Sequence, residues 1–131
     1  MREIKFRAWD EIGKWMGNVT SIDFDERTIF MTTRCSDDEN CFELDKTPVM
    51  QSTGLKDKND KEIYEGDIVK KVEAIPFIDT SDIVGVVKFV DGSFLLEYER
   101  WGEKLGCYLF SETDEHEILG NVHENPELLG E

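Results

Sequence analysis

The chain has 131 residues, of which 39% are hydrophobic and 34% charged, so it is long enough for one domain with a buried core. Thirty acidic residues against fifteen basic ones give a net charge of −15, which disfavours direct binding to nucleic acid or anionic membranes and suits a basic partner. No apolar run reaches the roughly 18 residues of a membrane span, and the N-terminus lacks the apolar core of a signal peptide. Three cysteines fit a reducing compartment. We therefore expect a cytoplasmic protein.

The N-terminal third is predicted to form β-hairpins. Ile4, Phe6 and Ala8 alternate with Lys5, Arg7 and Trp9, which is typical of a strand with one buried face. A polar turn follows, and a second strand is expected over residues 15–20. A second hairpin is predicted with its turn at Asp25-Glu26-Arg27 and its strands over residues 22–24 and 28–33.

The alternation stops between residues 34 and 46. Five acidic residues and no basic one stand between Arg34 and Lys46. We expect an acidic loop there, with a short edge strand over residues 41–44.

A stretch in the middle of the chain, residues 50–70, is rich in turn chemistry. Leu55 and Ile63 flank the segment Asp57-Lys58-Asn59-Asp60-Lys61, and Asp and Asn side chains bond nearby backbone groups and tolerate left-handed dihedral angles. This pattern predicts a hairpin. Gly66 is then expected to take a positive φ, Asp67 to cap the turn, and a β-branched strand to begin at Ile68.

The remaining residues also predict strands rather than helices. Asp91-Gly92 is the clearest hairpin signal in the chain. A sustained period of 3.6 residues is absent. The expected segments are strands over 68–75, 83–90, 93–98, 105–110 and 118–122, a connection over 76–82 and one helical turn over 111–116.

The middle stretch resembles the signature of the YopX family of phage and prophage proteins. Two further blocks, residues 4–10 and 117–129, fit the same family in the same order. The matching residues of the signature are Gln51, Thr53, Gly54, Leu55, Asp57, Asn59, Ile63, Tyr64, Glu65, Gly66, Asp67, Ile68 and Val69. Asp60 stands where the family usually has Gly, which favours a loop longer than a two-residue type I′ turn. The resemblance implies a phage- or prophage-encoded protein and carries no established activity.

Two candidate metal sites fail on spacing. Asp57, Asn59 and Asp67 suggest calcium, but an EF-hand loop that starts at Asp57 would require a glycine and a glutamate where this chain has Glu62 and Ile68. A zinc site lacks ligands two to four residues apart on a knuckle. Its candidate ligands would be Cys35, Cys41, Cys107, His116 and His123.

Three further patterns have a structural and a functional interpretation. Lys5, Arg7 and Trp9 alternate on one strand; we expect this basic face to pair with acids of this chain or of a second copy rather than with single-stranded nucleic acid. Glu65 and Asp67 could form a catalytic carboxylate pair, although a turn role for Asp67 is favoured. The tail over residues 111–131 holds seven acids and neither Lys nor Arg, which suits either a solvated end or a surface for a basic protein.

We therefore predict a mainly β fold with little helix, made of N-terminal β-hairpins and a small, bent, partly open SH3-like barrel. The chain is expected to be a single domain over residues 1–131, with the hairpins and the acidic loop in 1–49 and the barrel in 50–131. The predicted function is non-catalytic binding, without catalytic, cofactor or metal residues, and the expected partner is a second copy or a basic host protein. An acidic DNA mimic that inhibits a host DNA-binding protein, and a hydrolase that uses Glu65 and Asp67, remain open as alternatives.

Overall fold

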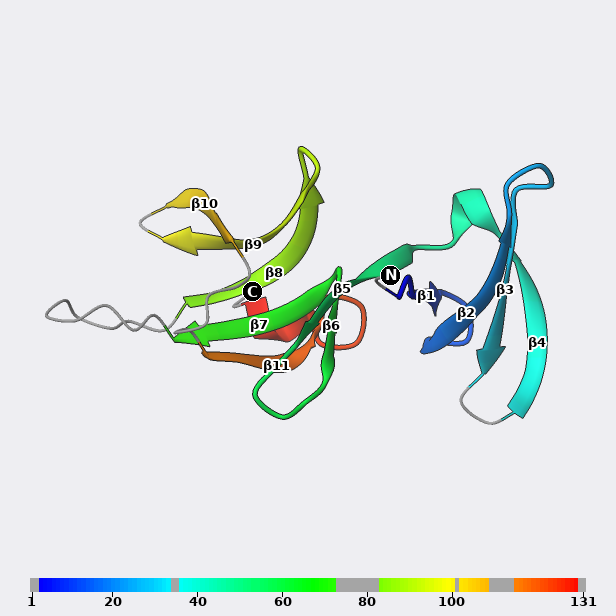
Figure 1. The fold of residues 1–131 in the computed structure, drawn as a ribbon, viewed down its shortest axis with the longest axis horizontal. Coiled ribbons are helices and arrows are strands. Elements are labelled where there is room, and N and C mark those ends of the chain that lie inside the picture. The colour runs from blue at the N-terminus through cyan, green and yellow to red at the C-terminus, as the bar shows by residue number, and fades with distance from the viewer. Residues whose placement is uncertain (1–2, 34–35, 73–82, 101, 109–114, 130–131) are drawn as a thin grey trace, which may run out of the picture. The chain divides into compact units, whose positions relative to one another are not determined.

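The computed structural model describes residues 3–33, 36–72, 83–100, 102–108 and 115–129. The chain divides into two compact units, Met1–Ser52 and Thr53–Glu131. Within the described residues, helix is confined to two short 3-10 segments, η1 (Leu44–Lys46) and η2 (Pro126–Leu129). All other regular elements are strands of two open antiparallel sheets (Figure 1), so the prediction of a mainly β, partly open fold with little helix is confirmed.

The first unit is built from successive hairpins. Its strands are β1 (Phe6–Asp10), β2 (Trp15–Asp23), β3 (Thr28–Thr33), β4 (Ser36–Glu43) and the first part of β5 (Val49–Lys56). They lie in the order β4-β3-β2-β1-β5. Because β1 is paired on both sides, with β2 and with β5, it is an interior strand of this sheet.

The core of the first unit lies on one face of this sheet. Ala8, Ile29 and Met31 are fully buried. They pack against Trp15, Val19, Ile22, Phe42, Leu44 and Val49. A β-bulge between Val19 and Ser21 shifts the alternation of β2, and this shift brings Ile22 to the core side.

The second unit contains a five-stranded sheet in the order β10-β9-β8-β7-β11. Its strands are β7 (Asp67–Val72), β8 (Ile83–Val90), β9 (Ser93–Arg100), β10 (Glu103–Tyr108) and β11 (Glu115–Asn121). The second part of β5 forms a hairpin with β6 (Glu62–Tyr64). Five buried residues make the core of this unit: Ile63, Val69, Ile83, Val87 and Leu96.

Two turns confirm what local chemistry predicts. Asp91 and Gly92 both have positive φ, 49° and 81°, as a two-residue type I′ hairpin turn requires. Gly66 has φ 84°, which favours glycine because it lacks a Cβ atom. Gly66 N also donates to Val87 O at 2.9 Å, and Gly66 O accepts from Val122 N at 2.9 Å, so this turn joins three segments of the second unit.

The loop expected over residues 34–46 is wrong over most of its length. Within that range the structure has the eight-residue strand β4 and then η1. The short edge strand expected over residues 41–44 is present as the end of β4, which lies at the edge of its sheet. β4 pairs with β3 in a register that places Phe42 opposite Ile29 and Asn40 opposite Met31. The polar, acidic composition hides the strand because charged residues are tolerated, and even favoured, on the edge of a sheet.

Other expectations need correction or fall outside the described residues. Trp9, expected on the basic face of the first strand, is 4% exposed, and its neighbour Ala8, on the opposite face of β1, is 0% exposed. Both faces of the strand are therefore covered at this point. The helical turn expected over 111–116 is wrong where the structure describes it, since Glu115 and His116 belong to β11. The connection over 76–82, the strand ends at 73–75 and 109–110, and residues 111–114 lie outside the described residues. The single-domain expectation with a boundary at 49/50 stays a prediction.

Candidate functional site

The central stretch with the family-like signature forms a network of backbone bonds around Asp57. Asp57 is 7% exposed. Its Oδ1 accepts hydrogen bonds from Asn59 N and Lys61 N, both at 2.9 Å. Its Oδ2 accepts from Ile118 N of β11 at 3.0 Å. One carboxylate therefore closes its own turn and also ties the β5–β6 hairpin to a strand 61 residues away.

The electrostatics of Asp57 follow from these donors. Burial alone opposes ionisation, but the backbone N–H groups of Ile118, Lys61 and Asn59 outweigh burial and hold the pKa of Asp57 below its usual value. Two contacts of the neighbouring residue reinforce the same link: Lys58 N donates to His116 O at 2.9 Å, and Lys58 Nζ pairs with Glu117 at 2.6 Å.

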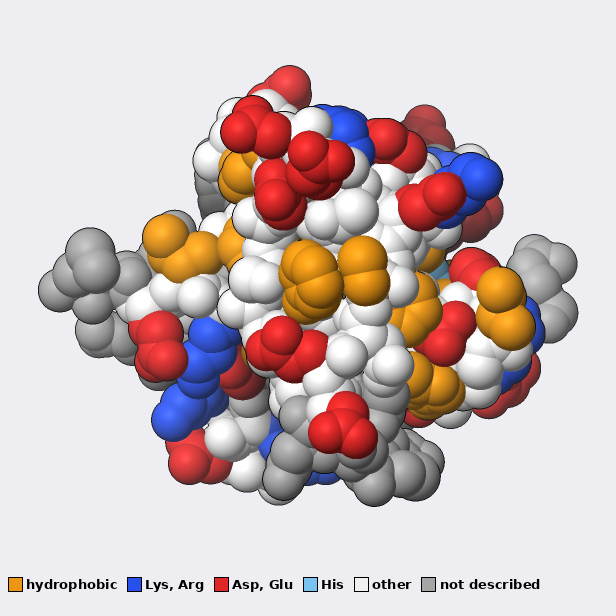
Figure 2. All heavy atoms as spheres, turned by 90° about the vertical axis from the view of Figure 1, so that its right-hand side faces the viewer, with side chains coloured by type: hydrophobic (Ala, Val, Ile, Leu, Met, Phe, Trp, Pro, Cys, Tyr) orange, Lys and Arg blue, Asp and Glu red, His pale blue; other side chains and the backbone are white. Residues whose placement is uncertain are grey.

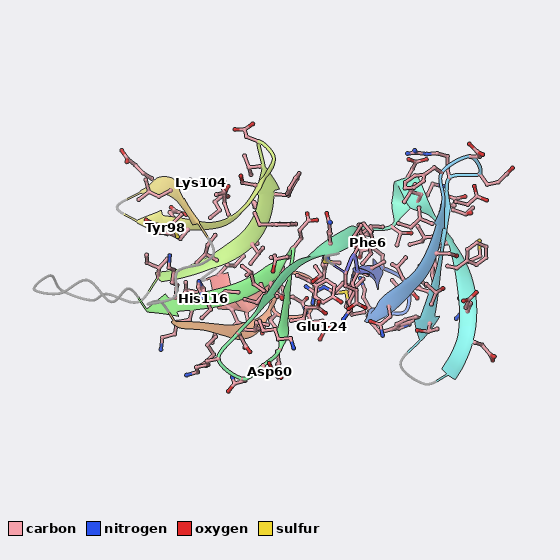
Figure 3. The ribbon with its side chains drawn as sticks, in the orientation of Figure 1. Phe6, Asp60, Tyr98, Lys104, His116 and Glu124 are labelled. Atoms are coloured by element: carbon pink, nitrogen blue, oxygen red, sulfur yellow. The ribbon has the colours of Figure 1, made fainter. Side chains whose placement is uncertain are left out.

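The turn that begins at Asp57 is a three-residue loop. Asp57 N donates to Lys61 O and Asp60 N donates to Asp57 O, and Asp60 has φ 65°. Asn59 has no positive φ, so this is a type I turn followed by a left-handed residue, not a two-residue type I′ turn. Asp60 occupies the left-handed position near the tip of the hairpin (Figure 3).

Thr53 and Asp67, two other residues of the signature, are also buried. Thr53 is 6% exposed; its hydroxyl donates to Ile63 O at 2.8 Å and accepts from Leu55 N at 3.1 Å. Gly54 has φ 82°. Asp67 is 2% exposed, and its Oδ2 accepts from Tyr64 N at 2.8 Å.

These contacts decide how Glu65 and Asp67 are interpreted. A carboxylate that is buried under its own turn cannot reach a substrate, so Asp67 is a turn cap in this geometry. Gln51 pairs with Phe6 in the β1–β5 ladder, and Glu65 lies in the turn before β7. The contacts of Thr53, Asp57 and Asp67 are thus structural.

Metal ligands do not gather in the described part of the chain: its His, Cys, Asp and Glu side chains form no group of three that could hold an ion. Cys41 is exposed on β4 of the first unit, whereas Cys107 is half-buried against the core of the second unit. His116 is 8% exposed on β11 (Figure 3). No helix in the described residues is long and apolar enough to cross a membrane.

The first unit carries a hollow of about 500 Å³ on the side of the sheet opposite its core. Ser21, Phe30 and Cys41 lie opposite one another on β2, β3 and β4, so they share this outer face. The hollow is lined by Ser21, Ile22, Asp23, Phe24, Asp25 and Phe30. Figure 2 shows acidic side chains next to exposed hydrophobic ones on the face that it presents.

Phe24 is the unusual residue of this hollow, because its side chain is 70% exposed. The turn holds it outside: Asp23 Oδ1 accepts from Asp25 N and Glu26 N, both at 3.0 Å. Arg27, the basic residue of the turn, pairs with Asp45, and its guanidinium lowers the pKa of Asp45. Phe24 therefore stands between two aspartates in the sequence, while the basic residue of the turn is already engaged with Asp45.

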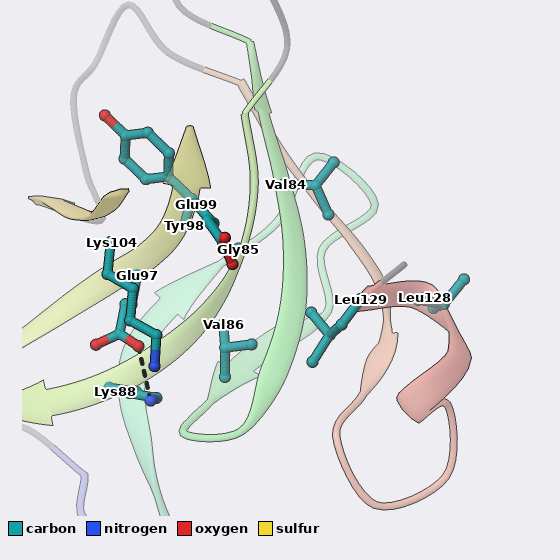
Figure 4. A pocket seen from close by; sticks show the side chains of 10 residues that line it. All are labelled: Val84, Gly85, Val86, Lys88, Glu97, Tyr98, Glu99, Lys104, Leu128 and Leu129. Carbon is teal, nitrogen blue, oxygen red and sulfur yellow. Dashed lines mark hydrogen bonds and ion pairs between the residues drawn. The ribbon is translucent and has the colours of Figure 1, made fainter. Parts of the chain in front are cut away.

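The second unit carries a groove of about 420 Å³ over β8, β9 and β10 (Figure 4). It was missed at the sequence level because its lining comes from three strands and from η2, which are distant in the chain. The Phe24 hollow was also missed, although a phenylalanine between Asp23 and Asp25 in a turn is a signal that could have found it.

The fold and the network around Asp57 define a class of small, mainly β proteins with two open sheets and a central turn held by a buried carboxylate. The YopX protein family model matches residues 5–130. The chain therefore belongs to the YopX family, as its signature residues predict.

Two solved structures are similar over nearly the whole chain. Protein EF1440 from Enterococcus faecalis has a TM-score of 0.53 and 28% identity, covering 98% of this chain and 99% of its own. Protein yopX from Bacillus subtilis has a TM-score of 0.65 and 22% identity, covering 97% and 96%. The comparison with curated proteins found no match.

Proposed function

We propose that the protein acts as a non-catalytic binding protein whose first unit recognises a basic segment of another protein. The observation that carries the proposal is Phe24, an aromatic side chain that is 70% exposed between two aspartates. An Arg or Lys side chain over an aromatic ring gains about 0.5–1 kcal/mol at an exposed site. Adjacent carboxylates add charge-assisted hydrogen bonds to the same cation.

The charge of the surrounding surface supports this choice of partner. Glu39 and Glu43 lie on β4 in the same alternating phase as Cys41, so they extend the acidic face beyond the hollow. Glu43 already pairs with Lys46 at 3.1 Å, but the face keeps an excess of carboxylates, which would repel an anionic ligand and attract a cationic segment. We propose the host-cell cytoplasm as the setting and a phage or prophage as the origin, on the basis of the family resemblance.

The test is a titration of the full chain with two peptides of equal length, one rich in Arg and Lys and one rich in Glu. We expect only the cationic peptide to bind, with an affinity that falls as salt is added, because exposed charges are screened within about 8–10 Å at physiological ionic strength. Phe24→Ala should weaken binding about two- to fivefold, which corresponds to the loss of one exposed cation–π contact.

The matched control is Phe89→Ala, since Phe89 is an exposed phenylalanine (52%) of the second unit. Equal weakening by both variants, or no cationic binding at low salt, would contradict the proposal. The acidic DNA-mimic hypothesis is one form of this function, in which the basic segment belongs to a DNA-binding face. That form is tested by adding duplex DNA to a mixture of this protein and the isolated partner, since DNA should then displace this protein from the partner.

A further inference from the structure

The groove of the second unit combines an apolar floor with an apolar wall. Val84 and Val86 of β8 form the floor, and Leu128 and Leu129 of η2 form the wall (Figure 4). Val84, Leu128 and Leu129 are 40%, 39% and 44% exposed. Together these side chains are an exposed apolar cluster, and such clusters mark interaction surfaces more often than isolated exposed residues do.

The wall of the groove is held in place by a capped turn. Asn121 Oδ1 accepts from His123 N at 3.0 Å and from Glu124 N at 2.8 Å. Asn125 N donates to Asn121 O at 2.8 Å, and Leu128 N donates to Asn125 O at 3.1 Å. The apolar wall is thus preorganised, which lowers the entropic cost of covering it.

The charged residues that line the groove are balanced, unlike the rest of the chain. Lys88 Nζ pairs with Glu97 at 2.8 Å, and Lys104 lies directly opposite Glu99 in the β9–β10 ladder. The lining therefore holds two bases and two acids. By contrast, residues 53–131 contain 19 acidic and 8 basic residues.

We propose that this groove is a self-association site, which the same groove of a second copy occupies. Two chains of −15 repel each other, and the repulsion is smallest where both surfaces are locally neutral. A row that contains both signs is also self-complementary under twofold symmetry, because Lys104 of one copy can face Glu99 of the other. A strongly acidic or basic partner would gain no net attraction from such a row.

The small number of lining residues implies a weak dimer. The groove is lined by ten residues, fewer than the roughly 20–30 per side of a standard protein–protein interface. Added salt should strengthen this association, because it screens the overall repulsion while the apolar contact remains. This salt dependence is opposite to that proposed for the cationic peptide at Phe24, so the two proposals can fail separately.

Sedimentation equilibrium of the full chain over a wide concentration range tests the inference. We expect a monomer–dimer equilibrium that tightens with salt, and Val84→Asp or Leu129→Asp should weaken it about tenfold or more. Leu119→Asp is the matched control, because Leu119 is 38% exposed on β11 and does not line the groove. Melting curves establish that each variant is folded.

A charge exchange tests the twofold pairing directly. Glu99→Lys should weaken the dimer even though it lowers the net charge of the chain, because it places two lysines opposite each other across the interface. The double variant Glu99→Lys with Lys104→Glu should restore association. A chain that stays monomeric at all concentrations, or a Leu129→Asp variant that associates as well as Leu119→Asp, would overturn the inference.

Discussion

Replacing Asp57 by Asn tests whether one carboxylate holds the second unit together. The two oxygens of Asp57 accept three backbone N–H groups, two on Oδ1 and one on Oδ2. An asparagine of the same shape has one acceptor oxygen, and its NH₂ group would face an N–H donor. At least one backbone donor, from Ile118 or from the pair Asn59 and Lys61, therefore loses its acceptor.

The expected cost follows from the number and kind of bonds lost. A hydrogen bond to a charged group contributes about 1.5–3 kcal/mol, and a buried donor without an acceptor costs about 1–3 kcal/mol. These contributions are not additive, so we expect Asp57→Asn to reduce the free energy of unfolding by about 2–4 kcal/mol. For a chain of this size that corresponds to a fall in Tm of roughly 10 °C.

Acid pH should abolish the difference between the two proteins. Folding lowers the pKa of Asp57, so the unfolded chain binds the proton more readily. The carboxylate therefore stabilises the fold fully above its unfolded pKa of about 3.9, and this stabilisation is lost as the pH falls through the lower folded value. Asp57→Asn lacks this contribution at every pH.

Urea unfolding at pH 7 and at a series of acidic pH values measures both effects. Asp60→Asn is the control, because the Asp60 side chain is 85% exposed and Asn also tolerates a left-handed φ. Equal stability of Asp57→Asn and the wild type at pH 7 would refute the reasoning. The reasoning would also be refuted if the difference in unfolding free energy between the wild type and Asp57→Asn did not become smaller at acidic pH.

Three further predictions concern the backbone, and each is measured as a change in the free energy of unfolding. Gly66→Val should cost more than about 1 kcal/mol, because valine strongly disfavours the φ of 84°. The control Gly106→Val should cost less, because an added Cβ at this strand position would lie no closer than 3.6 Å to any neighbour. A larger cost at Gly106 than at Gly66 would contradict this reasoning. Asp60→Gly should stabilise by up to about 1 kcal/mol, because it relieves a non-glycine φ of 65°; a lower Tm would show that the aspartate is favoured there. Gly85→Ala should cost about 2 kcal/mol or more, since its Cβ would lie 2.5 Å from the backbone oxygen of Glu97, and a neutral result would mean that β8 and β9 can separate at that point.

The features that local chemistry controls could be predicted from the sequence. A period of two residues identifies a strand wherever one face is buried and the other solvated. The Asp91-Gly92 turn and the positive φ of Gly66 depend on adjacent residues alone. The family signature could also be recognised, because its residues lie within one short stretch.

Long-range pairing decided what the sequence analysis missed. The acidic segment 36–43 is a strand because β3 lies beside it, and an edge strand needs no apolar alternation of its own. Asp57 was expected to serve its own turn, but its bond to Ile118 depends on the packing of β11. Trp9 is buried together with Ala8, so both faces of β1 are covered at this point, which alternation along one segment does not reveal.

Both candidate surfaces depend on tertiary structure for the same reason. Phe24 was predicted as part of a hairpin strand, whereas the bulge of β2 and the Asp23 cap decide that Ile22 faces the core and that Phe24 remains exposed. The groove of the second unit is assembled from β8, β9, β10 and η2. Composition and local pattern determine which residues form strands and turns. The pairing of distant strands decides which side chains meet and which remain exposed, because the register of that pairing sets the face on which each side chain lies.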